Sequence, residues 1–405
     1  MRQTLRSALA VAVVTVLLVG GAAGAGQPRS AIATDPAADQ VVAGENTTSH
    51  LPLPAGDVRT SRFADASLDV ASAVAIDGDR YDQQLLTRAT IEAFEAADTA
   101  DNRTAILRRA ADAIDNRSVA LMVRQQRAID QYNGGQLSTR ELLRELAVVD
   151  ARARTLTTVA DRLHEHARNV PGYALPNSLR TRLKWTLKGE PLLLEGPVRN
   201  EVRAAVTGAS DHRTVYVATT GQGVVLSTID GDRVIREAFL GSRYDHGGSD
   251  HFDVGLAYER VKRLYPWTTA HSIANPYTIT YGSIYRTTID HTQGQLVTVI
   301  DGSTTNVVRE VQEKRLAAIP VNRTVTGGTA DLRVRANLTH QTGPMQLTVL
   351  TAGGDPVPDA RIRVDDHLVG RTDDAGRLWT VQPVGTASVN ATTADGESAT
   401  LSLSG

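Results

Sequence analysis

The sequence contains no cysteine, which excludes several kinds of site at once. Its 405 residues offer no thiol for a disulfide, a thiolate zinc site, a cysteine nucleophile or a lipidated lipobox. Aromatic residues make up only 4% of the chain, too few to argue for a sugar-binding face of stacked rings. Lysine is scarce as well: the 43 basic residues include four lysines, so arginine supplies nearly all of the positive charge.

The sequence also lacks an excess of charge of either sign. The chain has 45 acidic and 43 basic residues. This balance gives no broad field to attract nucleic acid or an anionic membrane surface, so no nucleic-acid partner is expected. With 41% hydrophobic residues the composition is globular, and the length allows two or three domains with their own cores.

A long apolar run occurs only at the N-terminus. Arg2 and Arg6 precede an uncharged apolar stretch over residues 7–21, and the small residues Ala23-Gly24-Ala25 follow. This pattern predicts a secretory signal peptide over residues 1–25. The alternative is a leader that is not removed and anchors the chain, since about 20 apolar residues span a bilayer. We therefore expect an extracellular or cell-surface protein that meets the membrane only through an uncleaved leader.

Sequons for N-linked glycosylation are frequent. Each has the pattern Asn-x-Ser/Thr, which marks exposed sites in exported proteins, and their number fits a glycoprotein. The candidate asparagines are Asn46, Asn102, Asn116, Asn322, Asn337 and Asn390.

The rest of the chain predicts a multidomain α+β protein. Residues rich in Ala, Pro, Thr, Gly and Asp follow the leader and indicate a disordered linker. Helical periodicity comes next, then a mixture of strands and helices, and finally short strands alone. The predicted order is a linker at 26–64, an antiparallel helical hairpin or bundle at 65–170, a connector at 171–199, an α+β domain with an antiparallel sheet at 200–320, and a β-sandwich at 329–405.

Two long helices form the predicted hairpin. Apolar residues repeat alternately every four and three positions over 107–132 and again over 142–167. This heptad spacing places one apolar seam along each helix, as in a coiled coil. Residues 133–135, Asn-Gly-Gly, end the first helix because they tolerate the left-handed backbone of a helix terminus. Ser138 and Glu141 form a capping box that begins the second helix.

Strands and helices are mixed in the predicted middle domain. Alternating apolar residues and turn residues predict strands at 214–219, 223–229, 234–240, 277–289 and 296–300, and helices at 254–265 and 307–319. The segment YRTTIDHTQGQLVTVIDGSTTNVVREV at 285–311 resembles the second half of a PepSY-type domain. That resemblance implies a regulator or inhibitor of a secreted protease.

Short, evenly spaced strands fill the C-terminal part. They are predicted at 347–351, 360–364, 368–372, 378–381 and 387–392, which is typical of a β-sandwich. The motifs Gly-Asp-Pro-Val at 354–357, Asp359-Ala360 before a strand, and Asp-Asp-Ala-Gly at 373–376 resemble the carboxypeptidase regulatory-like (transthyretin-like) family. The resemblance implies an accessory or adhesive module.

The order of the parts resembles a group of uncharacterised secreted haloarchaeal proteins. The residues that carry this likeness are Leu68-Asp69-Val70, the helix-turn-helix junction at 132–146, and Tyr265-Pro266-Trp267. An arginine-rich, lysine-poor composition agrees with it. The resemblance implies no known activity and no cofactor.

The densest cluster of potential metal ligands is YDHGGSDHFD at 244–253. The candidate ligands are His246, His251, Asp250 and Asp253. Zinc requires imidazoles and carboxylates brought together, and a glycine-containing loop permits this without imposing it. The alternative is an exposed loop in which Asp250 or Asp253 caps the helix that begins near residue 254.

No pattern for a catalytic site occurs elsewhere. The sequence has no Gly-x-Ser-x-Gly elbow, no phosphate-binding glycine loop, and only His164-Glu165-His166 in place of a zinc-protease motif. We therefore expect a structural or interaction protein without catalysis, whose partner is a cell-envelope protein or a second copy meeting it through the helical hairpin. The alternatives are a metal-dependent hydrolase using the loop at 245–253 and a PepSY-like protease regulator.

Overall fold

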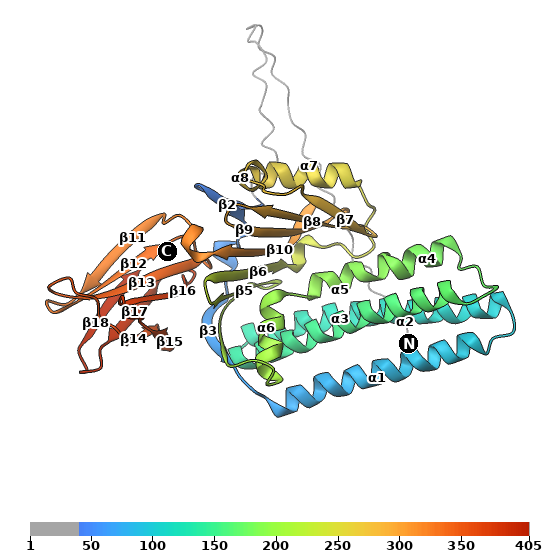
Figure 1. Cartoon of the computed structure of the whole chain (residues 1–405), viewed down its shortest axis with the longest axis horizontal. Helices are drawn as coiled ribbons and strands as arrows, with labels where there is room; N and C mark the ends of the chain where they lie inside the picture. Colours follow the sequence, from blue (N-terminus) through green and yellow to red (C-terminus); the bar gives the residue numbers. More distant parts are fainter. Residues whose placement is uncertain (1–39, 405) are drawn as a thin grey trace, which may run out of the picture. The chain divides into compact units, whose positions relative to one another are not determined.

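The computed structural model describes residues 40–404, so the predicted signal peptide lies outside the described part. Helices precede an antiparallel sheet, and a β-sandwich follows (Figure 1). This is the predicted multidomain α+β fold. The helices are α1 (Val70–Glu95), α2 (Ala100–Asn133), α3 (Thr139–Asn169), α4 (Asn177–Lys184), α5 (Gly189–Leu194), α6 (Pro197–Val206), α7 (Val254–Leu264) and α8 (Pro266–Ala270).

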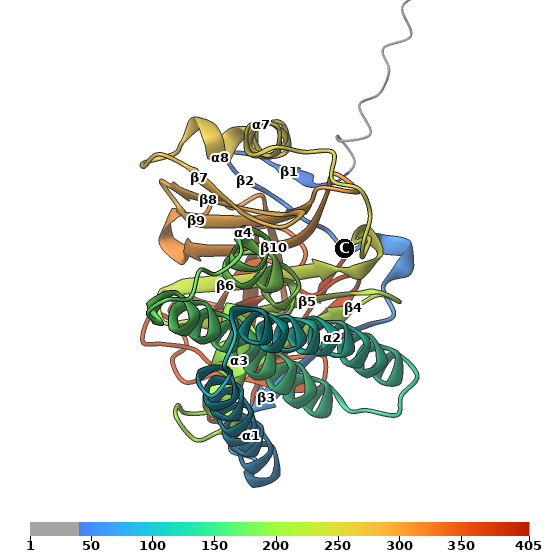
Figure 2. The same cartoon turned by 90° about the vertical axis from the view of Figure 1, so that its right-hand side faces the viewer.

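Eight strands form the central antiparallel sheet, in the order β3-β4-β5-β6-β10-β9-β8-β7. Figure 2 shows this order from β7 to β4. The strands are β3 (Thr60–Ala66), β4 (Arg213–Thr219), β5 (Gly223–Asp230), β6 (Arg233–Leu240), β7 (Tyr277–Tyr281), β8 (Ile284–His291), β9 (Gly294–Asp301) and β10 (Asn306–Arg315).

Alternating side chains give the sheet two buried faces. Val215 and Val217 of β4 belong to the core that α2, α3, α5 and α6 cover. Tyr216 and Ala218, one position along, belong to the core beneath α7. Successive residues of a strand point to opposite faces. A strand that is apolar at nearly every position therefore indicates a sheet covered on both sides.

The linker predicted at 26–64 is wrong for the part that the structure describes. Residues 42–50 form the hairpin of β1 (Val42–Gly44) and β2 (Thr47–His50), and β3 joins the central sheet beside β4. Leu51 and Leu53 are buried in the core beneath α7. The segment is ordered because these two leucines, although flanked by prolines, gain an apolar environment.

Two other assignments need correction. The helix predicted at 307–319 is strand β10, which pairs with β6 and β9 along its length. The connector predicted at 171–199 contains α4, α5 and the start of α6, and its leucines Leu183 and Leu194 are buried against the long helices. Helices α2 and α3 form the predicted pair, and α1 packs beside both of them.

The C-terminal region is a β-sandwich of two four-stranded sheets. Its sheets have the orders β11-β12-β13-β16 and β15-β14-β17-β18. The strands are β11 (Arg323–Gly328), β12 (Leu332–Leu338), β13 (Pro344–Thr351), β14 (Arg361–Val364), β15 (His367–Arg371), β16 (Arg377–Val381), β17 (Ala387–Thr392) and β18 (Ser398–Leu403). The sandwich begins before the predicted position 329. Among the described residues, no helix is both long and apolar enough to cross a membrane.

The predicted capping box is present at the start of α3. The Ser138 hydroxyl accepts a hydrogen bond from the Glu141 backbone amide at 3.3 Å, and the Glu141 carboxylate accepts one from the Ser138 amide at 2.7 Å. Two amides that lack partners within the helix are thereby satisfied.

Ser138→Ala should lower the free energy of unfolding by about 1 kcal/mol, because it leaves the Glu141 amide without its side-chain acceptor. Chemical denaturation measures this. Ser210→Ala is the control, since the Ser210 hydroxyl contacts only an exposed carbonyl, and it should change stability by less than about 0.5 kcal/mol. Equal effects of the two substitutions would contradict the role of the cap.

Candidate functional site

The structure separates the candidate metal ligands of the loop at 244–253. Asp253 caps α7 by accepting a hydrogen bond from the Leu256 amide at 2.8 Å, as the alternative interpretation predicted. Asp250 accepts from the Tyr285 hydroxyl at 2.7 Å, and His246 contacts Glu190. His251 is exposed, and its backbone amide bonds to the carbonyl of Gly302. In residues 40–404, no group of three or more His, Asp or Glu side chains is arranged to hold a metal ion.

The sequon asparagines fall into two groups. Asn46, Asn102 and Asn116 are exposed. In the sandwich, Asn322 is also exposed, and the side-chain amide of each sequon asparagine there donates a hydrogen bond to a neighbouring protein oxygen. These donors are Asn322, Asn337 and Asn390.

A polar hollow of about 450 Å³ lies between the α5–α6 junction and strands β8 to β10. The hollow forms because α6 covers β3 to β6, and the helix-facing side of β8 and β9 extends beyond that helix. Charged side chains from both sides meet there. Its lining residues are Arg154, Leu192, Glu195, Gly196, Pro197, Asn200, Arg286, Gln295, Val297, Arg309, Val311 and Glu313.

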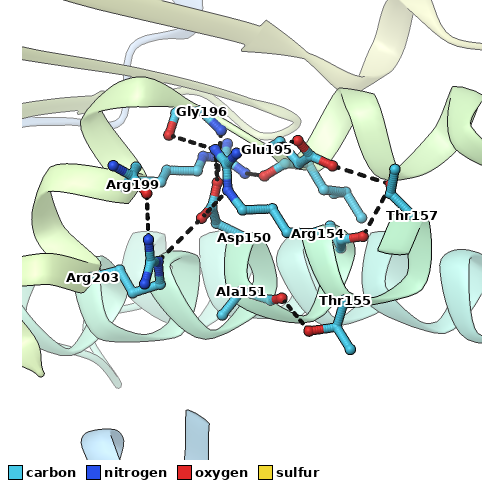
Figure 3. A network of polar contacts seen from close by, with 12 residues as sticks. Asp150, Ala151, Arg154, Thr155, Thr157, Glu195, Gly196, Arg199 and Arg203 are labelled. Carbon is cyan, nitrogen blue, oxygen red and sulfur yellow. Dashed lines mark hydrogen bonds and ion pairs between the residues drawn. The ribbon is translucent and has the colours of Figure 1, made fainter. Parts of the chain in front are cut away.

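Two buried carboxylates beside the hollow cap the N-terminus of α6 (Figure 3 shows Asp150). Asp150 is 0% exposed and accepts a hydrogen bond from the Gly196 amide at 2.8 Å. Glu237 of β6 accepts one from the Val198 amide at 3.2 Å. The helix has no side-chain cap of its own at Gly196, so these two acids satisfy its first amides and meet its partial positive charge.

Gly196 is required by this close approach. A Cβ atom added there would lie 1.9 Å from Oε2 of Glu237. Glycine therefore lets the carboxylate reach the helix terminus, at a position where its backbone is extended and unstrained.

Arginines neutralise the two capping carboxylates. Arg154 binds Asp150 through two hydrogen bonds of 2.9 and 3.0 Å. The buried Arg199 donates from Nε to Glu237 at 3.0 Å and from Nη1 to Gln125 and to the Leu194 carbonyl. Burial raises the pKa of Glu237, and Arg199 opposes that rise. Both Glu237 oxygens and the Arg199 Nε and Nη1 atoms have protein partners, which offset their lost hydration.

The central strands carry a matching pair of charges on each face of the sheet. Arg236-Glu237 of β6 and Arg309-Glu310 of β10 occupy adjacent antiparallel strands. Glu237 and Arg309 point to the helices, whereas Arg236 and Glu310 point to the opposite face. Each face thus receives one acid and one base.

The network on the opposite face connects the N-terminal segment, the sheet and the sandwich. Arg236 donates to Glu310 at 2.8 Å, to the Leu51 carbonyl at 2.6 Å and to the Thr342 hydroxyl at 2.8 Å. Glu310 also accepts from the Tyr265 hydroxyl at 2.7 Å. These bonds join segments far apart in the sequence to one buried ion pair.

Two histidines stack beside this network. The rings of His50 and His340 have centroids 4.1 Å apart and are nearly parallel. Burial is the main cause that lowers the pKa of both, and the positive charges of Arg236 and Lys314 lower each further. Burial also lowers the pKa of His291 to about 4. The fold therefore requires these imidazoles to be neutral.

None of these buried charges was identified from the sequence. A detectable signal was present: an Arg-Glu pair interrupts each of two otherwise apolar segments, VIREAFL at 234–240 and VVREV at 307–311. A charged pair inside a buried strand requires a partner pair close by.

Family comparisons divide the chain into three parts. A domain of unknown function (DUF7096) matches residues 1–211, more than half of the sequence, and the chain belongs to this family. A second family of unknown function (DUF7094) matches 215–320, and an archaeal fibronectin-III type-like domain matches 321–400. No curated protein and no solved structure matches the chain.

The family match refines the assignment of the sandwich. The fold is the predicted β-sandwich. The turn motifs resembled the carboxypeptidase regulatory-like family, but the family that matches is of archaeal fibronectin-III type. The likenesses to PepSY domains and to secreted haloarchaeal proteins remain predictions.

Glu237→Gln should destabilise the fold by about 3 to 5 kcal/mol, because it leaves Arg199 buried without its counter-charge. Glu259→Gln is the matched control. The Glu259 pair with Lys262 is exposed, so its loss should cost less than about 1 kcal/mol. Urea denaturation compares the two variants, and similar small losses would contradict a structural role for Glu237.

Acidification should destabilise the protein between pH 6.5 and about 4. The unfolded chain takes up protons on these histidines near their ordinary pKa of 6.5, whereas the folded chain does so only at lower pH, to about 4 for His291. Stability is therefore fully present above pH 6.5 and falls as the pH drops through this interval, by about 1.4 kcal/mol per unit of pKa difference.

Urea denaturation at pH 7.5, 6.5 and 5.5 measures this loss. The double variant His50→Phe/His340→Phe should retain more of its stability at pH 5.5 than the natural chain retains, because it keeps the stacked rings and removes two titrating groups. His251→Gln, which alters an exposed histidine, is the control for replacing a histidine without disturbing the buried pair. An unchanged slope in the double variant would contradict the assignment.

Proposed function

We propose that this chain is an exported protein of the cell exterior that acts as a structural or interaction module without catalysis. The predicted signal peptide and the exposed sequons support export. The fibronectin-III type domain supports an architectural role. No observation on residues 40–404 favours the metal-dependent hydrolase or the protease regulator.

The exposed apolar side of α1 carries this proposal. The helix is 26 residues long, yet its buried residues are only Thr87 and Phe94. An apolar stripe on its open side consists of Val70, Val74, Tyr81 and Leu85, each between 59% and 68% exposed. Contiguous exposed apolar residues are unfavourable in water and mark surfaces that bind a partner.

The spacing of this stripe favours a second copy of the chain as the partner. Steps of four, seven and four residues keep the four side chains on one side of a helix with 3.6 residues per turn. The four positions are symmetric about the midpoint between Asp77 and Gly78. In an antiparallel pair of α1 helices related by a two-fold axis, Val70 therefore faces Leu85 of the other copy, and Val74 faces Tyr81.

The centre of the stripe is compatible with close approach of two copies. Gly78 has no side chain, and no atom lies within 4 Å of the position that a Cβ would take. Asp77 and Arg80 form an exposed ion pair at 3.3 Å beside it. A two-fold axis at this point brings the Asp77 carboxylates of the two copies near each other, and the two Arg80 guanidinium groups that flank them supply compensating positive charge.

The self-association can be tested with a single cysteine. Because the chain has no cysteine, Gly78→Cys introduces the only thiol, next to the proposed axis. Mild oxidation should link two copies, since a disulfide forms when the two Cα atoms are within about 7 Å. Val254→Cys, on an exposed position of α7, is the control and should not be linked to a second copy.

Analytical ultracentrifugation provides the second test of the same surface. Val74→Ser/Leu85→Ser should shift a concentration-dependent dimer to monomer, while Val254→Ser/Leu256→Ser, which alters exposed apolar residues of α7, should not. Self-association would be refuted if the natural chain stays monomeric at high concentration and Gly78→Cys gives no disulfide-linked dimer. Crosslinking on intact cells would then decide whether another envelope protein covers α1.

A further inference from the structure

The hollow beside α6 contains a buried guanidinium with unused hydrogen-bond donors. Arg309 of β10 is 5% exposed and lines the hollow. Its one hydrogen bond to a described residue runs from Nη1 to the Leu192 carbonyl at 3.0 Å. A guanidinium has five N–H donors, so four are left without an acceptor among residues 40–404. The unpaired nitrogens are not closed off from the hollow, so an acceptor that enters the hollow can meet them.

A second arginine lies across the sheet from Arg309. Arg286 of β8 also lines the hollow and forms neither a hydrogen bond nor an ion pair with a residue of the described part. Val299 on the intervening strand β9 is the pairing partner of both arginines. Paired residues point to the same face, and two strand spacings separate the backbones by about 10 Å. Two long arginine side chains at this separation can reach one anion between them.

The acidic residues of the hollow do not supply that anion. Glu195 pairs with Arg154 at 3.5 Å, and Glu313 pairs with Arg233. The oxygens of the nearby Glu237 accept from Arg199 and the Val198 amide. Burial lowers the pKa of Arg309 to about 10, which agrees with a cation whose compensation is incomplete.

We propose that this hollow binds a small hydroxylated molecule through a carboxylate or phosphate group held by Arg309 and Arg286. Guanidinium groups match both oxyanions in charge and in the geometry of their donors. The volume of about 450 Å³ is that of a small-molecule site.

The remaining lining residues specify the rest of the ligand. The Asn200 Oδ1 atom is occupied by Arg203, which leaves its amide group as a donor. The Gln295 amide donates to Asp290 at 2.7 Å, which leaves its Oε1 atom as an acceptor. A donor and an acceptor at the sides suit hydroxyl groups, and Leu192, Val297 and Val311 suit a short carbon skeleton. A sugar acid or a sugar phosphate has this combination.

Calorimetric titration of the full chain with three probes tests the proposal. Glucuronate and glucose 6-phosphate carry the anion on the same ring, and glucose lacks it. Tighter binding of glucuronate assigns a carboxylate ligand, and tighter binding of glucose 6-phosphate assigns a phosphate ligand. Binding of glucose as tight as that of either anion, or no binding of any probe at millimolar concentration, would overturn the site.

Arg286→Gln is the decisive variant, because Arg286 has no partner in the described part of the chain whose loss would disturb folding. It should weaken binding of the preferred anion at least tenfold and leave thermal unfolding unchanged. Arg361→Gln, an exposed arginine of the sandwich, is the matched control and should bind as the natural chain does. Unaltered affinity in Arg286→Gln would refute the assignment, as would an equal loss in Arg361→Gln. Self-association through α1 is measured separately, so failure of either proposal leaves the other intact.

Discussion

The capping of α6 by two buried carboxylates is the interaction on which the rest of the structure depends. Asp150 comes from the long helix α3 and Glu237 from the central strand β6, and both end at the first amides of one short helix. The helical region and the sheet are therefore joined through charges that cannot separate without leaving an unpaired ion in an apolar core. The same junction forms one wall of the arginine-rich hollow, so a stability element and a candidate binding site share their framework.

Two families of unknown function combine in one folding unit here. Strand β3 belongs to the part matched by the first family, and its pairing partner β4 lies largely in the part matched by the second. Strand β3 forms the edge of the sheet, and three long helices separate it in the sequence from β4. Neither family's part of the chain therefore contains the complete sheet. The fibronectin-III type sandwich is attached to this sheet by apolar and polar contacts, including the burial of Val381 in the core beneath α7 and the bond from the Val384 amide to the Tyr216 hydroxyl at 2.8 Å.

Features that depend on residues close in the sequence were predictable, whereas features that depend on pairing between distant segments were not. Ser138 with Glu141 located the start of α3 because a capping box acts within four residues. Strand β10 was misread as a helix because charges buried on both of its faces hide the alternation expected of a strand. The loop at 244–253 shows the same limit, since Asp250 accepts a hydrogen bond from Tyr285 and His246 contacts Glu190, and both partners are distant in the sequence. Arg286 and Arg309 are 23 positions apart, and only the register of three strands brings them to one face.

Hydrogen exchange of two amides in the unaltered protein tests the central claim most directly. The Gly196 and Val198 amides are at a helix N-terminus, where amides normally have no partner and exchange rapidly. If Asp150 and Glu237 hold them as described, both should exchange only when the whole domain unfolds, at the rate of the most protected amides of β6. Exchange as fast as that of exposed loop amides would show that the carboxylates do not secure α6, and the account of how the helices and the sheet are joined would be wrong.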